Sequence, residues 1–506
     1  MSPAPLPANR WLVLVAVMLA FLPVVLDMTI LHVAIPTLTQ SLNASGTQVL
    51  WIIDIYPLLM AGLLVPMGTL ADRVGNRRIL LIGLFTFAVA STGAAFAQSP
   101  EMLIAARVLL ALGGSMIMPC VLGLIRKTFE DEGERAMALG LWGMVGSAGA
   151  ALGPLVGGAL LEHFWWGSVF LINVPVMLLV APACHALLPR LEETSPGKWP
   201  IGQALLLIAG MVSLVYAIKA GFGGQQPRAI IAIAFVVGIA ALTLFARKQL
   251  RSPEPMLDLS LLSHPAIVAG LIMAVIASGA LAGVELTLAQ ELQYVLGKTP
   301  LQAGLFLVPI MAAAALGGPA AGSLSNRFGL RPVATLSLAV SAGALVFLAQ
   351  SDFHDPGLRV PLALAILGLA LSIGLTASSI AIMGSVDAGR GGAAGALEAT
   401  GYELGTGLGI TFFGVFMSSV FSRAIALPSS VPQALAEQAS RTIGDAYIIA
   451  GALPGEEGAA LIEAGKAAFT QTHAILLTAA AGVIAVLAVV VFFTLAGYRR
   501  PSRAHP

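Results

Sequence analysis

Charged residues are scarce in this sequence of 506 residues. Only 10% are Asp, Glu, Lys or Arg, whereas ordinary soluble domains carry about 25%. Because 58% of the residues are hydrophobic and the mean hydropathy is +0.92, too few polar side chains remain to cover a soluble core. The composition therefore excludes an ordinary soluble domain and predicts an all-α polytopic membrane protein.

Other scarcities exclude whole classes of function. A net charge of +1 lacks the basic excess of nucleic-acid-binding proteins. The two cysteines, Cys120 and Cys184, lie far apart in apolar stretches and imply no disulfide framework. The histidines show no pair at helical spacing, so no helical metal site is predicted. The GKT at 297–299 has Leu292 where a phosphate loop requires glycine. We therefore expect no enzyme, no cofactor and no ATP-driven motor.

Long apolar runs dominate the sequence instead. A membrane-spanning helix needs about 20 apolar residues, and fourteen segments meet this length approximately. We expect the first of them to be retained in the protein as a span. The predicted spans are 11–36, 49–70, 79–98, 101–125, 137–160, 168–188, 201–219, 229–246, 265–288, 302–322, 332–350, 360–383, 393–420 and 473–496.

The distribution of positive charge orients these spans. Of the 26 Lys and Arg residues, eighteen fall on one face of the membrane and seven on the other, and Arg107 lies inside a span. Since cytoplasmic loops are rich in Lys and Arg, the first face is predicted to be cytoplasmic. An even number of spans then places both termini in the cytoplasm. The segment at about 421–472 faces outward, either as an ordered hairpin loop or as a solvated one.

Two loops on the predicted cytoplasmic side repeat one another. Gly68–Arg78 reads GTLADRVGNRR after the second span, and Gly322–Pro332 reads GSLSNRFGLRP after the tenth. Self-similarity at corresponding points of two halves is typical of transporters built from repeats. We therefore predict a six-helix bundle at 1–190, two inserted transmembrane helices with linkers at 191–258, and a second six-helix bundle at 259–506.

Five motifs in order resemble the major facilitator superfamily. Gly68–Arg78 resembles its signature between the second and third helices, and Arg107–Pro119 (RVLLALGGSMIMP) resembles its fourth-helix motif. Gly146–Gly158 (GSAGAALGPLVGG) resembles the fifth-helix motif of its drug:proton antiporters, and Leu26–Pro36 and Trp165–Pro175 resemble the fourteen-helix branch (DHA2). Within that branch the similarity is greatest to SmvA-type methyl viologen and quaternary ammonium efflux pumps. It is carried by LHVAIPTL, LWIIDIY, LLEHFWWGSVFLINVP, AQELQ and YELGTGLGI.

Two of these motifs are assigned to gating. Small residues in the repeated loop let helix ends approach, so that an acid there can accept hydrogen bonds when the cytoplasmic side closes. The alternative is an ordinary positive-inside loop, and the second copy has lost its acid because Asn326 replaces Asp72. In the fifth span, glycines around a proline favour close packing, and the resemblance implies a flexing helix between the bundles. The gating residues are Gly68, Asp72, Arg73, Gly75, Arg77, Arg78, Gly153 and Pro154.

Asp27 is a carboxylate in the otherwise apolar VVLDMTILHV of the first span. A charge there costs several kcal/mol unless it is paired or used. Arg107 in the fourth span needs an anion because its guanidinium stays protonated. The first and fourth helices are neighbours in the superfamily, so the resemblance implies that the two side chains pair, directly or through water. The alternative to a titrating carboxylate is a static pair that fixes helix register. His32 stands where the branch usually has Asn, and its role stays open.

Other acids lie within the predicted spans. Glu398 and Glu403 point about 140° apart on one helix, so that one is expected in the cavity and the other in an interhelical contact. Glu291 is interpreted as a solvated helix end. Five acids against one base favour a cation in the cavity, and aromatic rings can face it. The predicted substrate-binding residues are Asp54, Glu285, Glu398, Glu403, Trp51, Tyr56 and Tyr402, and those for proton coupling are Asp27, Arg107, Glu285 and Glu403.

These features predict a proton-coupled antiporter that exports lipophilic mono- and dications, such as quaternary ammonium biocides, viologens and cationic dyes. We expect a monomer in the lipid of the bacterial inner membrane, with cationic drugs and protons as its partners and no nucleic acid. One alternative is an exporter of neutral or zwitterionic antibiotics or metabolites, in which acid-to-amide changes would spare transport. Another is a non-transporting scaffold or sensor, which would show no counterflow in liposomes.

Overall fold

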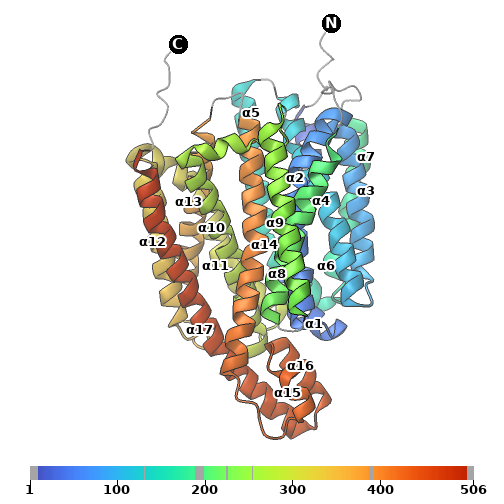
Figure 1. Ribbon diagram of the computed structural model, residues 1–506, viewed down its shortest axis with the longest axis vertical. Coiled ribbons are helices and arrows are strands. Elements are labelled where there is room, and N and C mark those ends of the chain that lie inside the picture. Colours follow the sequence, from blue (N-terminus) through green and yellow to red (C-terminus); the bar gives the residue numbers. More distant parts are fainter. Residues whose placement is uncertain are drawn as a thin grey trace.

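Long helices run side by side through the whole molecule (Figure 1). The computed structural model describes residues 10–129, 131–188, 199–223, 226–253, 255–386 and 391–497. Within these ranges, 14 helices are long and apolar enough to cross a membrane, one for each predicted span, and no strand occurs. The predicted all-α polytopic class is therefore confirmed.

The first six spans pack together as one group. α4 begins behind an N-cap, where the Ser99 hydroxyl accepts a hydrogen bond from the Met102 N–H, and the sixth span is interrupted between two helices. The elements are α1 (Arg10–Leu42), α2 (Gly46–Val74), α3 (Asn76–Ala95), α4 (Pro100–Thr128), α5 (Glu132–His163), α6 (Ser168–Leu171) and α7 (Asn173–Leu187).

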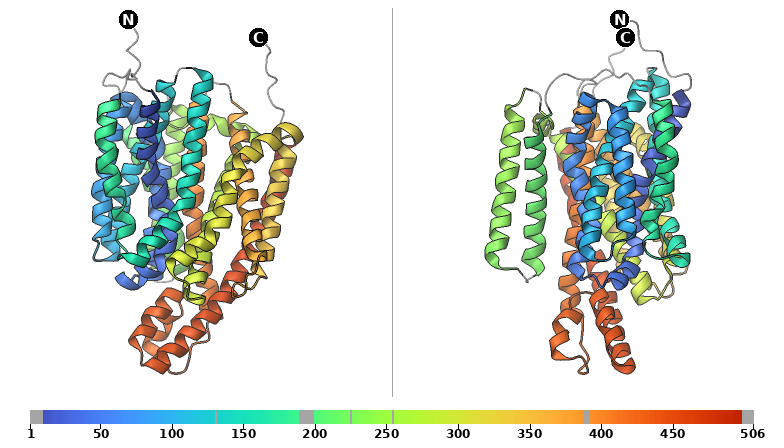
Figure 2. Two further views of the ribbon diagram at one scale, coloured as in Figure 1. Left: turned by 180° about the vertical axis from the view of Figure 1, so that it is seen from behind. Right: turned by 90° about the vertical axis from the view of Figure 1, so that its right-hand side faces the viewer.

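The next two spans lie together on one side of the other helices (Figure 2, right). They are α8 (Ile201–Gly223) and α9 (Arg228–Arg251), which pack on each other. α8 also contacts α2 and α14 (Gly391–Ala424), whereas α9 leaves apolar side chains such as Ile233 and Val236 exposed. This pair therefore presents one helix to the bundle and the other outward.

The remaining spans form the second group. α17 begins well before the predicted span at 473, because its first turns project beyond the bundle. The elements are η1 (Leu259–Ser263), α10 (Pro265–Gln290), a π-helical turn at Glu291–Val295 (η2), α11 (Pro300–Phe328), α12 (Leu330–Ala349), α13 (Arg359–Met383), α14, α17 (Gly455–Thr494) and η4 (Leu495–Gly497).

An ordered hairpin joins α14 to α17. It contains α15 (Gln433–Ala439) and α16 (Ile443–Ala452) and projects from one end of the bundle (Figure 1). Apolar side chains including Phe421 and Phe469 form its own small core. Of the two alternatives for the segment at 421–472, the ordered hairpin is therefore the one observed.

The repeated loops have matching backbones. Gly75 joins α2 to α3 with a φ of 107°, and Gly329 joins α11 to α12 with a φ of 89°. Both values fall in the left-handed region that residues with a side chain rarely adopt, which explains the glycine at each position. The repeat seen in the sequence is therefore a structural repeat.

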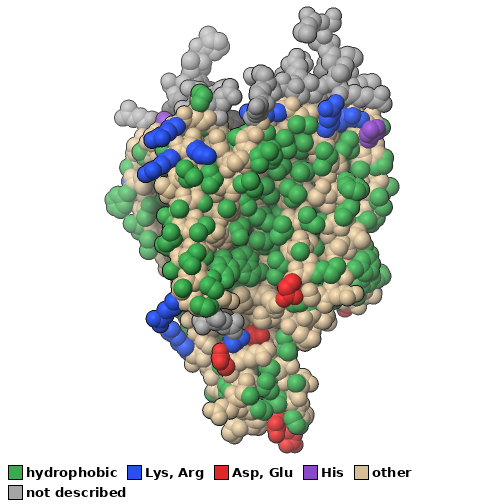
Figure 3. Space-filling model, turned by 45° about the vertical axis from the view of Figure 1, so that its right-hand side comes forward, with side chains coloured by type: hydrophobic (Ala, Val, Ile, Leu, Met, Phe, Trp, Pro, Cys, Tyr) green, Lys and Arg blue, Asp and Glu red, His purple; other side chains and the backbone are tan. Residues whose placement is uncertain are grey.

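α1 begins and α17 ends at the same end of the bundle, opposite the hairpin (Figures 1 and 2). Apolar side chains cover much of the flank, whereas Lys and Arg gather toward its ends (Figure 3). We keep the division at 1–190, 191–258 and 259–506 as a proposal; its first boundary lies outside the described residues.

Candidate functional site

An ion pair links α1 to α4 inside the first group of helices. The guanidinium of Arg107 donates to the Asp27 carboxylate, and its Nε donates to the backbone oxygen of Ile52 at 2.9 Å. Both residues are 1% exposed. Asp27 Oδ1 finds no hydrogen-bond partner among the described residues. The predicted pairing is thus direct, and one carboxylate oxygen stays available.

Tyr56 on α2 connects this pair to the second group of helices. The guanidinium carbon of Arg107 lies 4.6 Å from the centroid of the Tyr56 ring. Tyr56 is fully buried and close enough to both Asp27 and Glu403 for their charges to act on it. The ring therefore contacts Arg107 and lies within electrostatic reach of an acid of α14.

The two acids of α14 have different surroundings. Glu403 is 5% exposed, and its Oε2 has no hydrogen-bond partner in the described part of the chain. Glu398 is half-buried and meets the hydroxyl groups of Ser379 and Tyr402. The Tyr402 hydroxyl also donates to the backbone oxygen of Leu375 on α13 at 2.9 Å. Glu398 thus belongs to a contact with α13, whereas Glu403 is buried within electrostatic reach of Tyr56.

Lys219 corrects the sequence-based charge balance. Lys219 is one of the seven basic residues that the sequence places on the second, outer face of the membrane. In the structure it lies within α8, is 3% exposed, and places Nζ 2.7 Å from Asp54 Oδ1. Nζ also lies 3.5 Å from the centroid of the Trp51 ring. The Thr411 hydroxyl of α14 donates to Asp54 Oδ2 at 2.6 Å. The bundle interior therefore holds at least two bases, Lys219 and Arg107.

A third acid–base pair crosses between the two groups of helices. His32 Nδ1 of α1 lies 3.4 Å from Glu285 Oε2 of α10, and both side chains are buried. This proximity gives His32 an acidic neighbour, which the sequence left open, although neither ring nitrogen makes a hydrogen bond to a described residue. It also joins Glu285, assigned to substrate and proton, to the helix that carries Asp27.

Glu291 is the second correction. It was interpreted as a solvated helix end, yet it is 2% exposed. The Thr470 hydroxyl donates to its Oε1 at 3.1 Å, and His473 Nδ1 lies 3.7 Å from its Oε2. The early start of α17 covers this carboxylate, which the predicted span at 473–496 did not include. The sequence signal for this was the long helical pattern before residue 473.

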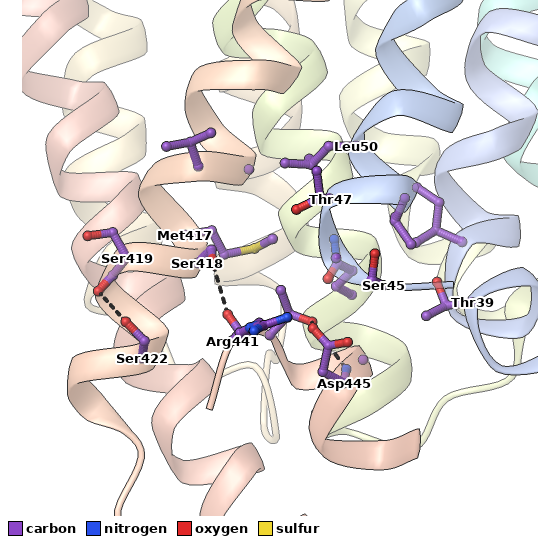
Figure 4. A pocket seen from close by; sticks show the side chains of 18 of the residues that line it. Thr39, Ser45, Thr47, Leu50, Met417, Ser418, Ser419, Ser422, Arg441 and Asp445 are labelled. Carbon is purple, nitrogen blue, oxygen red and sulfur yellow. Dashed lines mark hydrogen bonds between the residues drawn. The ribbon is translucent and has the colours of Figure 1, made fainter. Parts of the chain in front are cut away.

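A cavity of about 380 Å³ opens at the hairpin end between the two groups of helices (Figure 4). We call it the hairpin cavity. Its wall combines Thr39 of α1, Leu50 of α2, Met417 of α14 and Asp445 of α16, and Lys219 also lines it. The Asp445 carboxylate accepts hydrogen bonds from the Thr442 hydroxyl at 2.7 Å and from the backbone N–H of Gly46. The hairpin thereby touches the start of α2.

The gating residues of the first loop lie at the opposite end of the bundle. Arg77 donates to the backbone oxygen of His185, in the last turn of α7, at 2.8 Å. At the equivalent point of the second loop, Arg331 donates to the oxygen of Phe492 in the last turn of α17, at 2.7 Å. Both arginines therefore satisfy carbonyl groups that a helix end leaves open.

The other loop residues differ in exposure. Gly68 lies close to Pro119 of α4, because a Cβ on it would meet the proline Cβ at 3.4 Å. Asp72 and Arg78 are exposed and Arg73 is half-buried. These positions leave the latch as a prediction, because it concerns a change between two states.

α5 packs through its glycines against two helices. A Cβ on Gly153 would come within 3.1 Å of the Ile30 backbone nitrogen of α1. On another face, a Cβ on Gly158 would come within 2.6 Å of Leu301 Cα of α11, and a Cβ on Gly304 of α11 would press on the Pro154 carbonyl group. The fifth-helix motif thus lies where the two groups of helices meet.

Comparisons with known proteins agree with this architecture. The pattern described as the Major Facilitator Superfamily matches residues 17–410. The methyl viologen resistance protein SmvA of Salmonella typhimurium is 44% identical, over 97% of this chain and 99% of its own. The multidrug efflux pump LfrA of Mycolicibacterium smegmatis is 35% identical, over 95% and 96%. The resemblance predicted from the motifs is therefore confirmed.

A solved structure shows the same fold. It is that of a bacterial homolog to the human lysosomal transporter Spinster, in an inward-facing and occupied conformation. It has a TM-score of 0.66 and 20% sequence identity, and the match covers 98% of this chain and 99% of that one. The fold predicted for two six-helix bundles with two inserted helices is thus the observed one.

Proposed function

Since this chain belongs to the Major Facilitator Superfamily, we propose that it is a proton-coupled antiporter exporting lipophilic mono- and dications. The observation that carries the proposal is the position of Glu403. Oε2 of this buried carboxylate has no hydrogen-bond partner in the described part of the chain, and the carboxylate is close enough for its charge to act on Tyr56, the ring that faces Arg107. An unpaired acid in a poorly hydrated interior favours a cation or a proton.

Charge balance supports a cation as the cargo. Arg107 and Lys219 each face one acid, Asp27 and Asp54. Glu403 and Glu398 remain without a basic partner among the described residues. The negative excess is therefore smaller than the sequence suggested, but it is concentrated on α14.

Competition between proton and cation would drive the cycle. Protons from outside neutralise Asp27 and one or more of Glu285, Glu398 and Glu403, and the cation leaves outward. Loss of the protons to the cytoplasm restores the negative site. Each elementary charge that crosses the membrane is worth about 2.3 kcal/mol per 100 mV. An exchange of two protons for one monovalent cation would therefore draw on the potential as well as on the pH difference.

The names of the relatives support the same class of cargo. One is a resistance protein for methyl viologen, which is an aromatic dication, and another is a multidrug efflux pump. We place the protein in the bacterial inner membrane as a monomer with both termini in the cytoplasm. The hairpin cavity then opens outward, on the side where cargo would be released.

Proton release from everted membrane vesicles tests the proposal. Respiration acidifies the vesicle interior, and a fluorescent pH probe follows it. Addition of methyl viologen should raise the interior pH in vesicles that contain the protein, because cargo enters as protons leave. Glu403→Gln should lose this response, whereas Asp352→Asn, which changes an acid in an exposed loop, should keep it. An unchanged response in Glu403→Gln, or no response in the wild type, would contradict the proposal.

A further inference from the structure

The inserted helix pair places a charge against the main bundle that the proposed cycle does not use. Lys219 of α8 holds Nζ 2.7 Å from Asp54 Oδ1 and 3.5 Å from the centroid of the Trp51 ring. The side chains of Lys219 and Asp54 are 2% and 0% exposed. α8 thus reaches into the bundle with an ammonium group while its partner α9 stays outside.

The groups around this ammonium are those that an organic cation needs. A carboxylate supplies the counter-charge, and the face of an indole ring attracts a cation electrostatically. The Thr411 hydroxyl of α14 holds the other oxygen of Asp54 at 2.6 Å, so the carboxylate is fixed by groups from two other helices. Tyr216 of α8 lies 6.4 Å from Trp51, ring centroid to ring centroid, and extends the aromatic surface. The result is a complete cation site that already contains a tethered cation.

We infer that Lys219 is an internal competitor for the cargo cation at Asp54 and Trp51, and that it thereby determines which cations the protein accepts. The inference rests on the proposed export of cations. A tethered ammonium has an effective concentration in the millimolar range or above. A weakly binding monocation therefore does not displace it. A large aromatic cation, or a dication whose second charge adds a further attraction, competes better with the Lys219 ammonium.

The hairpin cavity could accommodate the displaced ammonium group of Lys219. Lys219 lines the hairpin cavity, and the same wall carries Asp445 and the ion pair of Glu437 with Arg441. A released ammonium would therefore enter a polar cavity rather than an apolar interior, where an unpaired charge carries a large cost in free energy. Cargo at Asp54 would in this way release α8 from α2, so that the inserted pair responds to occupancy.

Equilibrium binding to the purified full-length protein tests the inference, with ethidium as monocation and methyl viologen as dication. Lys219→Met removes the competing charge but keeps an unbranched side chain. It should tighten ethidium binding by roughly tenfold, because the tethered competitor is gone. The ratio of methyl viologen affinity to ethidium affinity should therefore decrease. Lys466→Met, which alters a lysine paired with Glu463 on the surface of α17, should leave both affinities within about twofold of the wild type.

A charge-free double variant addresses the alternative, a static ion pair that only fixes the position of α8. Asp54→Asn with Lys219→Met leaves no uncompensated charge, so it should unfold near the wild-type temperature. If Asp54 binds cargo, this variant should bind ethidium roughly tenfold or more weakly than Lys219→Met, which corresponds to the loss of one counter-charge. Equal ethidium affinities of these two variants would overturn the inference. Where Lys219→Met does not fold, the ratio of methyl viologen affinity to ethidium affinity is compared between the double variant and the wild type, and an unchanged ratio would overturn the inference.

The result of Lys219→Met is equally decisive where that variant folds. Unchanged or weaker ethidium binding would overturn the inference even if the wild type exports cations normally. A wild type that neither binds nor exports ethidium or methyl viologen would instead overturn the proposed function itself. The two failures are therefore distinguishable.

Discussion

Arg107 on α4 pairs with Asp27 on α1 while both side chains are almost completely withdrawn from solvent. The guanidinium keeps its proton at all working pH values, so only Asp27 can change charge within the pair. Arg107 also donates to the Ile52 backbone oxygen at 2.9 Å, which holds it in place when the carboxylate is neutral. Arg107 would therefore keep one hydrogen-bond partner if Asp27 were protonated, as the proposed cycle requires.

Asp27→Asn should abolish proton-driven efflux while the protein still inserts and folds. The amide mimics the protonated acid in size and still offers Arg107 an oxygen, but it cannot release a proton. Drug-driven proton release from everted vesicles should disappear, whereas cation counterflow in liposomes, which needs no proton movement, should persist. Wild-type resistance together with wild-type proton release would rule out a coupling role for Asp27.

Arg77→Ala with Arg78→Ala should weaken transport more than binding. Arg77 holds the last turn of α7, so its loss costs about 1 kcal/mol of stability, the net contribution of one partly exposed hydrogen bond. If the loop acts as a latch, the Arg77→Ala and Arg78→Ala variant should also transport more slowly. Arg331→Ala is the comparison variant, because it removes the equivalent hydrogen bond to Phe492, together with a contact 3.9 Å from the centroid of its ring, from a loop that lacks the acid.

Both variants should lower the unfolding temperature, and only the change in the first loop should slow efflux. Normal dye binding together with normal transport in the Arg77 and Arg78 variant would exclude the latch. Orientation in the membrane must be measured first, because these residues also carry part of the positive-inside signal.

Gly158→Ala should destabilise the arrangement in which α5 touches α11. A Cβ at this position would meet Leu301 Cα at 2.6 Å and the Pro300 oxygen at 2.7 Å, both of them backbone atoms. Overpacking of this kind costs about 1–3 kcal/mol. Gly93→Ala on α3 is the control, since nothing lies within 4 Å of the added atom. Equal unfolding temperatures and equal transport rates for the two variants would show that the close approach has no importance.

Asp445→Asn should remove one pH-dependent contribution to stability at the hairpin. Burial raises the pKa of Asp445 above its ordinary value of 3.8, against the opposing effect of its hydrogen bonds. The folded state therefore holds the proton more tightly than the unfolded state. This contribution is fully present below the ordinary pKa and is lost as pH rises through the folded-state pKa.

The measurement is the unfolding temperature of both proteins across this range. The unfolding temperature of the wild type minus that of Asp445→Asn should decrease as pH rises, because only the wild type must then bury a charge. The asparagine still accepts a hydrogen bond from the Gly46 N–H, so the hairpin should remain docked on α2. A constant difference from acid to neutral pH would show that Asp445 does not titrate in this way.

Sequence reasoning located every span because apolar length is a property of the local sequence. It also placed Asp27 beside Arg107, since the family motifs supplied the neighbouring helices. The burial of Lys219 was not predicted, for a physical reason. A lysine near the end of a span is expected to extend its long side chain to solvent. The apolar run continues to Gly221, and that continuation was the available signal.

Two other contacts depend on packing that no local pattern contains. Glu291 is buried only because α17 starts at Gly455 and covers it with Thr470. His32 meets Glu285 because two helices from different halves cross at that depth. In both cases the residue types were visible in the sequence, but their partners are set by the tertiary structure.

Glu398→Gln and Glu403→Gln should have unequal effects, and the structure now indicates which is which. Glu403 is buried within electrostatic reach of Tyr56, and its Oε2 receives no hydrogen bond from any described residue. Glu398 meets Ser379 and Tyr402 toward α13. We therefore expect Glu403→Gln to change cation affinity, and Glu398→Gln to change stability or coupling.

The charge of the cargo sharpens this test. A dication in a poorly hydrated site needs two counter-charges, whereas a monocation needs one. Glu403→Gln should thus weaken inhibition of dye efflux by viologens roughly tenfold, equivalent to about 1.4 kcal/mol, and weaken inhibition by monocations less. Since the amide is nearly isosteric with the acid, packing should survive in both variants, so an altered affinity reports charge. Measured across outside pH, the two variants should also differ in proton dependence. Unchanged affinities for both charge classes would refute a cation-binding role for α14.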